Sequence, residues 1–134
     1  EQRLAVIREY LAFLIQVADR LTHEFMDDEA RRTLVTGFAK KVIEHLQDNS
    51  QDLLGAGDYG SPFIRLLNQR SDEYAEFQLT EDGPSYAFLR HLGFEIQQIM
   101  GARQENRWVI DQVMDKDGWD AYTQFSRALR NLFD

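Results

Sequence analysis

The sequence predicts an all-α protein, a compact single-domain bundle of five to six helices that spans residues 1–134. Apolar residues recur at three- and four-residue spacings along most of the chain, and this is the helical period. No stretch alternates convincingly between apolar and polar residues, as a strand does. The chain has 43% hydrophobic residues, 12% aromatic residues and only two prolines, which is enough material for one core at this length.

The first helix is predicted over residues 4–21. Its apolar positions lie on one helical face; they are Leu4, Ile7, Leu11, Leu14, Ala18 and Leu21. A second apolar set widens this stripe beyond the roughly 100° that a surface helix needs; it consists of Val6, Tyr10, Phe13 and Val17. We therefore expect this helix to be central or to face another subunit, and the second set is the predicted homodimer interface.

The second helix is predicted over residues 27–49, because acidic residues stand at its start, where the helix dipole favours them. Its end is expected at the segment DNS, residues 48–50. After a glycine loop, Ser61 and Pro62 predict the N-cap and first position of a third helix. This third helix is expected to run to about Phe77.

Gly83 and Pro84 repeat the cap-and-proline pattern and predict the start of a fourth helix, which Gly101 closes. Two shorter helices are expected over residues 105–115 and 118–133, with Asp117 as the cap between them. Aromatic residues crowd this half of the chain and are expected to be core at helical spacing; they are Trp108, Trp119, Tyr86, Phe88 and Phe94.

The composition of the chain excludes several classes of partner and chemistry. The net charge of −8 and the pI near 4.8 oppose binding to nucleic acid, and the longest apolar stretch, Tyr10 to Ile15, is too short to cross a membrane. The absence of cysteine excludes thiol nucleophiles and zinc ribbons. We expect a cytoplasmic protein, because the N-terminal residues are too charged for a secretory signal. The acidic run at residues 71–83 is interpreted as a solvated face, with a basic partner or a cation as the alternative.

The segment GAGDYG, residues 55–60, has the GxGxxG spacing of dinucleotide-binding loops. The residues before it are polar and helix-like, and no βαβ unit follows, so an ordinary loop is the favoured interpretation. The alternative is an anion or small ligand held at the start of the third helix. Its predicted ligand-binding residues are Gly57, Tyr59, Ser61, Arg65, Arg70 and Tyr74.

Arg70 stands out because it falls within the apolar stripe of the third helix. A cation in that position must reach solvent or pair with a carboxylate. A structural ion pair with Glu73, or with an acid elsewhere, is the favoured interpretation. The alternative is an arginine that recognises an anion, because its planar guanidinium suits carboxylate and phosphate groups.

The sequence matches known metal-binding motifs poorly. The segment DKDGWD, residues 115–120, fails the register in which calcium loops place their ligands. His91 and Glu95 lie one helical turn apart, as do Asp19 and His23. However, the chain contains no Glu-x-x-His, the motif of di-metal helical bundles. The histidines are therefore interpreted as surface residues, and no metal or cofactor is predicted.

The leading hypothesis is a non-enzymatic interaction module that self-associates as a homodimer and docks a protein partner on its acidic side. The alternative is a binding or sensor domain for a small ligand, either anionic or flat and apolar. An enzyme whose site is scattered in sequence is the third hypothesis. No GxSxG, SxxK or P-loop lysine is present, so no catalytic residue is predicted.

Overall fold

The computed structural model describes residues 2–101 and 109–131, and these residues form five helical rods. Four of them are α1 (Gln2–His23), α2 (Asp28–Leu54), α3 (Gly60–Tyr74) and α4 (Tyr86–Met100). The fifth joins α5 (Val109–Gln112), a π-helical turn η2 (Val113–Asp117) and α6 (Gly118–Asn131). A small hairpin, β1 (Leu79–Thr80) and β2 (Gly83–Pro84), connects α3 to α4. The predicted all-α bundle is confirmed. None of the described helices has both the length and the apolar character needed to cross a membrane.

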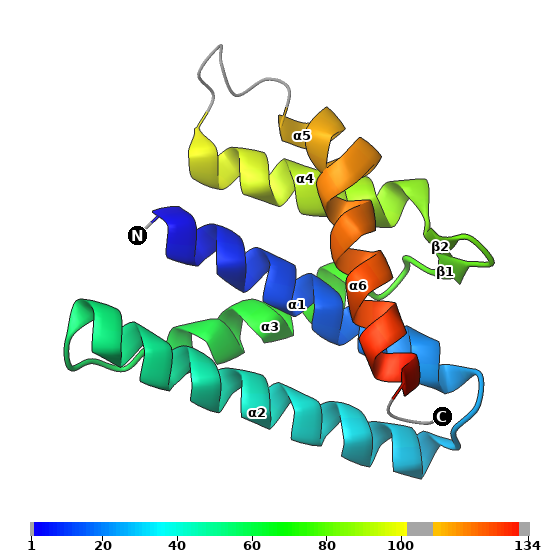
Figure 1. The fold of residues 1–134 in the computed structure, drawn as a ribbon, viewed down its shortest axis with the longest axis horizontal. Coiled ribbons are helices and arrows are strands. Elements are labelled where there is room, and N and C mark those ends of the chain that lie inside the picture. The colour runs from blue at the N-terminus through cyan, green and yellow to red at the C-terminus, as the bar shows by residue number, and fades with distance from the viewer. Residues whose placement is uncertain (1, 102–108, 132–134) are drawn as a thin grey trace.

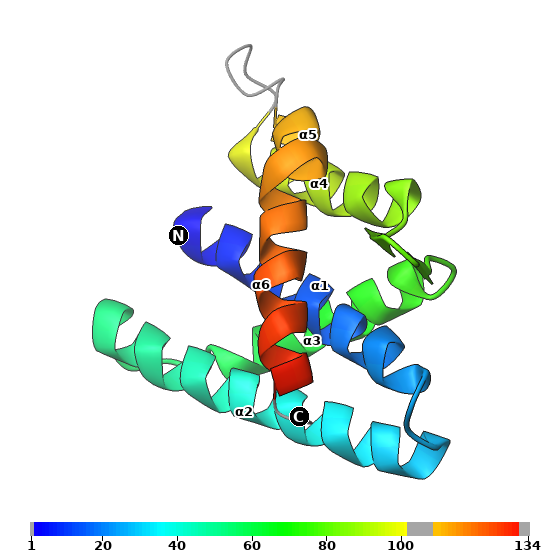
Figure 2. The same ribbon diagram turned by 45° about the vertical axis from the view of Figure 1, so that its right-hand side comes forward.

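Helix α1 runs through the middle of the bundle, with α2 on one side, α4 on the other and α6 crossing it (Figure 1). The turned view in Figure 2 shows the same order. One apolar cluster lies between α1, α4 and the last rod and includes Phe13, Val17, Phe88, Leu92 and Val109. A second lies between α1, α2 and α3 and consists of Ala12, Ile15, Leu46 and Phe63. Helix α1 is thus apolar on two sides because it separates two cores.

The central position of α1 corrects the prediction that its second apolar set forms a homodimer interface. Phe13 and Val17 are each 0% exposed within the single chain, so neither can contact a second subunit unless the core opens. Val6 and Tyr10 are half-buried and pack against the same core cluster. Of the two explanations for the wide apolar stripe, a central helix is the one that the structure supports.

Helix α2 begins as predicted but ends later. Asp27 is its N-cap, and a carboxylate oxygen of Asp27 accepts a hydrogen bond from the Ala30 N–H at 2.8 Å. The expected end at DNS is wrong, since the helix continues to Leu54 and stops at Gly55, whose φ is +93°. The DNS segment stays helical because Ser50 is buried in the bundle, so packing outweighs the local turn preference.

The predicted caps of α3 and α4 are both displaced by a few residues. The N-cap of α3 is Tyr59 instead of Ser61, and the Ser61 N–H donates to the Asp58 carboxylate at 3.0 Å. Gly83 and Pro84 form strand β2 instead of starting α4, and Gly83 has a φ of +125°. The N-cap of α4 is Ser85, whose hydroxyl accepts from the Phe88 N–H at 3.2 Å. The end of α4 at Gly101 is confirmed.

The last rod is one continuous helix where the sequence predicted two. Asp117 ends the π-helical turn and caps nothing; its carboxylate accepts from the Gln112 side chain at 3.3 Å. The chain continues through Gly118, where a Cβ atom would approach the Leu89 side chain to 2.7 Å, so the glycine permits close contact with α4. Residues 105–108 of the expected helix, with Trp108, lie outside the described residues.

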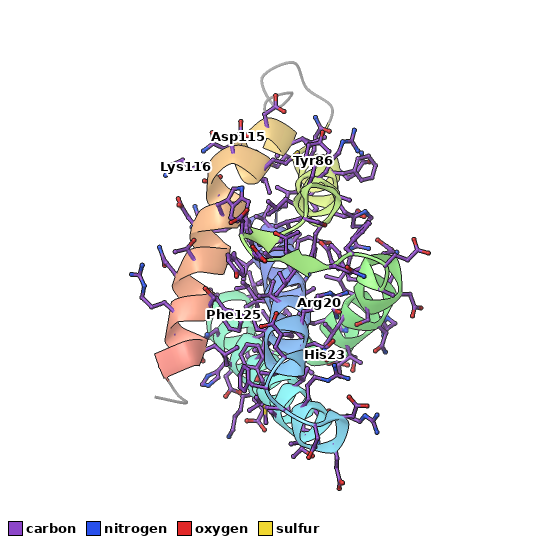
Figure 3. The ribbon with its side chains drawn as sticks, turned by 90° about the vertical axis from the view of Figure 1, so that its right-hand side faces the viewer. Arg20, His23, Tyr86, Asp115, Lys116 and Phe125 are labelled. Atoms are coloured by element: carbon purple, nitrogen blue, oxygen red, sulfur yellow. The ribbon has the colours of Figure 1, made fainter. Side chains whose placement is uncertain are left out.

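The aromatic residues in the C-terminal half of the chain are buried at only some of the positions where a core residue was predicted. Phe125 extends from α6 toward the inside of the molecule (Figure 3), where its ring centroid lies 5.5 Å from that of Phe38 on α2. Phe88 is fully buried, as expected. Tyr86 and Phe94, also predicted to be core, are instead 71% and 41% exposed; both lie on the outer side of α4.

Candidate functional site

A row of polar side chains on α1 faces α3 inside the bundle. Glu9, Gln16 and Arg20 are spaced seven and four residues apart and so share one helical face. Gln16 Nε2 donates to the Ser71 hydroxyl at 2.7 Å. Arg20, labelled in Figure 3, donates to two backbone carbonyl oxygens at and beyond the end of α3, at 2.5 and 2.7 Å. These contacts tie α1 to α3 by hydrogen bonds as well as by apolar packing.

The third member of the row, Glu9, makes a buried ion pair with Arg70. Arg70 Nε and Nη2 each lie 2.8 Å from one of the two Glu9 carboxylate oxygens, which is the bidentate arrangement. The two residues are 7% and 3% exposed. Arg70 also lies 3.0 Å from Glu73 and 3.3 Å from Glu95. The structural ion pair predicted for Arg70 is confirmed, and its partners come from α1, α3 and α4.

His91 completes this buried charged cluster, which we define as Glu9, Arg70, Glu73, His91 and Glu95. Glu73 Oε2 lies 3.0 Å from Arg70 Nη1, and Glu73 Oε1 lies 2.6 Å from His91 Nε2. Glu95 Oε1 lies 3.3 Å from Arg70 Nη2, and Glu95 Oε2 lies 3.4 Å from His91 Nε2. Glu95 therefore faces Arg70 with one oxygen and His91 with the other, whereas Glu73 Oε1 contacts both residues, since it also lies 3.2 Å from Arg70 Nη1.

Burial and neighbouring charges act against each other in the cluster. Burial raises the pKa of Glu95; the charge of Arg70 opposes this, and the charges of Glu9 and Glu73 raise that pKa further. Burial acts in the same direction on Glu73, but its hydrogen bond with His91 and the charge of Arg70 outweigh burial and lower its pKa. Burial alone would lower the pKa of Arg70, yet the three carboxylates raise it overall. Arg70 therefore stays a guanidinium.

Tyr74 borders the cluster with a hydroxyl that lacks a partner. The residue is 0% exposed, and no hydrogen-bond partner for the hydroxyl lies among residues 2–101 and 109–131. Its ring packs edge-on against the His91 ring, with 5.1 Å between the centroids. Burial raises the pKa of Tyr74, and the nearby charges of Glu9, Glu95 and Glu73 raise it further against that of Arg70. The hydroxyl is therefore neutral and close to the charged cluster.

A separate apolar groove lies between the N-terminal half of α1 and the C-terminal half of α2. It is half-open, with a volume of about 660 Å³. Its apolar lining consists of Leu4, Ile7, Leu11, Val42, Leu46 and Leu53. Its polar lining comes from α2 alone and consists of His45, Asn49, Ser50 and Asp52. This mixture of an apolar wall and a few polar groups on one side is typical of small-molecule sites.

The floor of the groove carries a second unpartnered hydroxyl. Ser50 is 1% exposed, and its Oγ has no hydrogen-bond partner in the described part of the chain. At the rim, Ile7 and Leu53 are 44% and 81% exposed. The groove thus offers apolar surface to a ligand together with a buried hydroxyl that has unused hydrogen-bonding capacity.

The GAGDYG loop has none of the structure of a dinucleotide site. It joins α2 directly to α3, so the ordinary-loop interpretation is confirmed. Gln47 Oε1 accepts from the backbone N–H groups of Tyr59 and Gly60 at 2.7 and 2.9 Å. Asp58 accepts from the Ser61 N–H. Side chains of the protein therefore already occupy the amides that an anion would need.

The predicted ligand-binding residues separate into two groups along α3. Gly57, Tyr59, Ser61 and Arg65 lie at or before its first half, whereas Arg70 and Tyr74 belong to its second half, at the charged cluster. Each nitrogen of the Arg70 guanidinium is within 3.0 Å of a carboxylate oxygen. Three carboxylates therefore already surround Arg70 and would repel an external anion, and the six residues do not come together as a single anion site.

Sequence reasoning predicted the Arg70–Glu73 pair but missed Glu9, although Glu9 left a signal, and it did not place Glu95 beside Arg70. Glu9 interrupts the apolar stripe between Val6 and Phe13, as Arg70 interrupts the stripe of α3. A buried acid and a buried base on different helices are natural partners, because neither charge is stable alone in a core. Glu95 was noted only as a neighbour of His91.

Comparisons of the chain with models of protein families, with curated proteins and with solved structures found no match.

Proposed function

We propose that the protein is a non-enzymatic binding module whose ligand lies in the groove between α1 and α2. The ligand would be a small molecule with a flat or elongated apolar body and one polar group. The observation that carries this proposal is the unpartnered, buried Ser50 hydroxyl in the lining of a groove of about 660 Å³. Leaving such a hydroxyl without a partner costs about 1–3 kcal/mol, and a ligand with a polar group removes this cost.

The lining supports the same ligand chemistry. The apolar side chains come from both helices, so an apolar body inserted between them would lose water contact on two sides. The polar side chains of α2 lie on one side of the groove, which favours one polar group on the ligand over several. The volume falls within the range of about 300–1,000 Å³ that such pockets have.

The first test is native mass spectrometry of the purified protein, followed by titration with the fluorescent dye 1-anilinonaphthalene-8-sulfonate, which has a flat apolar body and one anionic group. Ile7→Asp is expected to weaken dye binding by about ten-fold, or about 1.4 kcal/mol. The matched control is Ile64→Asp on α3: Ile64 is 42% exposed against 44% for Ile7, and it lies outside the groove lining. Equal affinities of the two variants would contradict the proposal.

Replacing Ser50 with alanine is expected to raise the stability of the protein and to weaken ligand binding. The substitution removes a buried hydroxyl, unpartnered among the described residues, from the C-terminal part of α2 and introduces the best helix former, so the free energy of unfolding should rise by about 1 kcal/mol. The same change should weaken a ligand that hydrogen-bonds to Ser50. Urea unfolding measures the first effect and ligand titration the second. A loss of stability would show that the hydroxyl already has a partner.

Self-association remains a second candidate, with a different surface from the one expected on α1. Leu53 and Leu54 are 81% and 50% exposed at the end of α2, next to the groove. A second copy could cover them by placing its own α2 end against the groove. The native mass spectrum distinguishes the candidates, since a dimer without extra mass favours self-association and a monomer with an adduct favours the small ligand. Leu53→Asp should abolish such a dimer.

A further inference from the structure

We propose that Glu73, His91 and Glu95 bind a divalent metal ion, such as Zn²⁺ or Mn²⁺, which occupies the space between His91 Nε2 and the two carboxylates. Their nearest ligand atoms all lie within 4.8 Å of one another. This site shares no residue with the α1–α2 groove and does not depend on the function proposed above. The inference rests on three features of the buried charged cluster: its oxygen geometry, its charge and the Tyr74 hydroxyl.

The carboxylate oxygens are already turned toward one point. Glu73 Oε1 and Glu95 Oε2 both face His91 Nε2, at 2.6 and 3.4 Å. A neutral imidazole carries at most one proton on Nε2, so it can donate a hydrogen bond well to only one of these oxygens. A metal ion at about 2.0–2.2 Å from each ligand atom would interact with both carboxylates and the ring nitrogen together, and Glu73 Oε1 would move from its 2.6 Å hydrogen-bond distance to make room for the ion.

Arg70 supports the two carboxylates from the opposite side. It contacts Glu95 Oε1, the oxygen that faces away from His91, and both oxygens of Glu73, at 3.0 Å for Oε2 and 3.2 Å for Oε1. Glu9 in turn fixes the guanidinium by two hydrogen bonds of 2.8 Å. Partners that hold ligating carboxylates in one orientation are typical of metal centres. In this arrangement Arg70 and Glu9 position the ligands without touching the ion.

The charge balance of the cluster also fits a divalent ion. Glu9, Glu73 and Glu95 are three carboxylates, and Arg70 is the one fixed cation among them. These four side chains leave two formal negative charges uncompensated in a partly buried cluster, and such charges are costly. A divalent cation at His91 compensates both.

Tyr74 provides independent evidence that a ligand belongs beside the cluster. Its hydroxyl is fully buried and has no partner among the described residues. It also lies close enough to the charges of Glu9, Glu73 and Glu95 to be affected by them. One imidazole and two carboxylates are ligands that Zn²⁺, Mn²⁺ and Fe²⁺ accept.

The ligands are reachable from outside. The side chains of Glu73, His91 and Glu95 are 28%, 24% and 16% exposed, whereas that of Glu9 is only 4% exposed. An ion can therefore enter on the His91 side while Glu9 and Arg70 remain within the bundle. This asymmetry separates the positioning residues from the ligands.

The test is isothermal titration calorimetry of the chelator-treated protein with Zn²⁺ and with Mn²⁺, supported by the visible absorption spectrum of the Co²⁺ complex. We expect one ion per chain. His91→Gln and Glu95→Gln should each weaken binding by at least about 100-fold and abolish the Co²⁺ band. The matched control is His23→Gln, since His23 is exposed at the end of α1 and should leave binding unchanged.

Thermal unfolding of each metal-free variant shows whether it is folded before binding is compared. Failure of the wild-type protein to bind any of the three ions at micromolar concentration would overturn the proposal. So would one-to-one binding that His91→Gln leaves intact, because the ion would then lie elsewhere. If His91→Gln does not fold, Glu95→Gln decides, because it keeps the shape of the side chain.

Discussion

Replacing Arg70 with methionine is expected to lower the free energy of unfolding by about 3–5 kcal/mol, because it leaves the Glu9 carboxylate in the core without its cation. Glu9 and Arg70 are 3% and 7% exposed and are joined by two hydrogen bonds of 2.8 Å. Because methionine keeps much of the side-chain length, the loss of stability reports the cost of the unpaired carboxylate more than the cost of a cavity. Urea unfolding of the metal-free protein measures it.

The double variant Glu9→Gln with Arg70→Met tests this explanation, because it also removes the unpaired charge of Glu9. It should recover a large part of the free energy of unfolding that Arg70→Met loses. Lys41→Met serves as the surface control. Lys41 pairs with Glu44 at 3.6 Å, but their side chains are 73% and 64% exposed, so the change should stay within about 0.5 kcal/mol. A similar small effect for Arg70→Met would mean that water reaches Glu9.

Phe88→Ala is expected to cost about 3–5 kcal/mol, because a fully buried ring at the centre of the larger core would leave a cavity. The Phe88 ring is 0% exposed, and its centroid lies 5.0 Å from those of Phe13 and Tyr74. The Arg20 guanidinium carbon also lies 5.0 Å from the Phe88 ring centroid, so a cation–π contact is lost as well.

Phe94→Ala is the matched control for this experiment, since it makes the same substitution on the same helix. Phe94 is 41% exposed, so we expect a loss below about 1 kcal/mol. Thermal and urea unfolding of the two variants should differ clearly. If the two losses were equal, Phe88 could not have the central packing role that its three ring contacts indicate.

The fold class and most helices were predictable from the sequence because apolar spacing reports directly on which faces are buried. Helix ends were less predictable, because they depend on side chains far away in sequence. Ser61 was expected to cap α3 from local preference, but Tyr59 is the N-cap, and the amides of Tyr59 and Gly60 donate to Gln47 of α2. Gly83 and Pro84 look like a helix start, yet the hairpin uses them, since Gly83 adopts a positive φ close to Trp119 of α6.

The site was harder to predict than the fold. Arg70 was recognisable from its position in an apolar stripe, and its ion pairing followed from the cost of burying a charge. The convergence of Glu9, Glu73 and Glu95 around it depends on how α1, α3 and α4 pack, and one sequence contains no record of that packing. The same limit explains the interface expected at Phe13, because a stripe covered by another helix and one covered by another subunit look alike in sequence.

The central place of α1 has a consequence for how the protein is made in the cell. This helix is synthesised before every element that covers it, and its partner α4 ends at Met100. At about 5–20 residues per second, the apolar segment from Tyr10 to Val17 would wait several seconds for that cover. During this interval the nascent chain exposes an apolar surface. We therefore expect a ribosome-associated chaperone to bind this segment and to release it once α4 emerges.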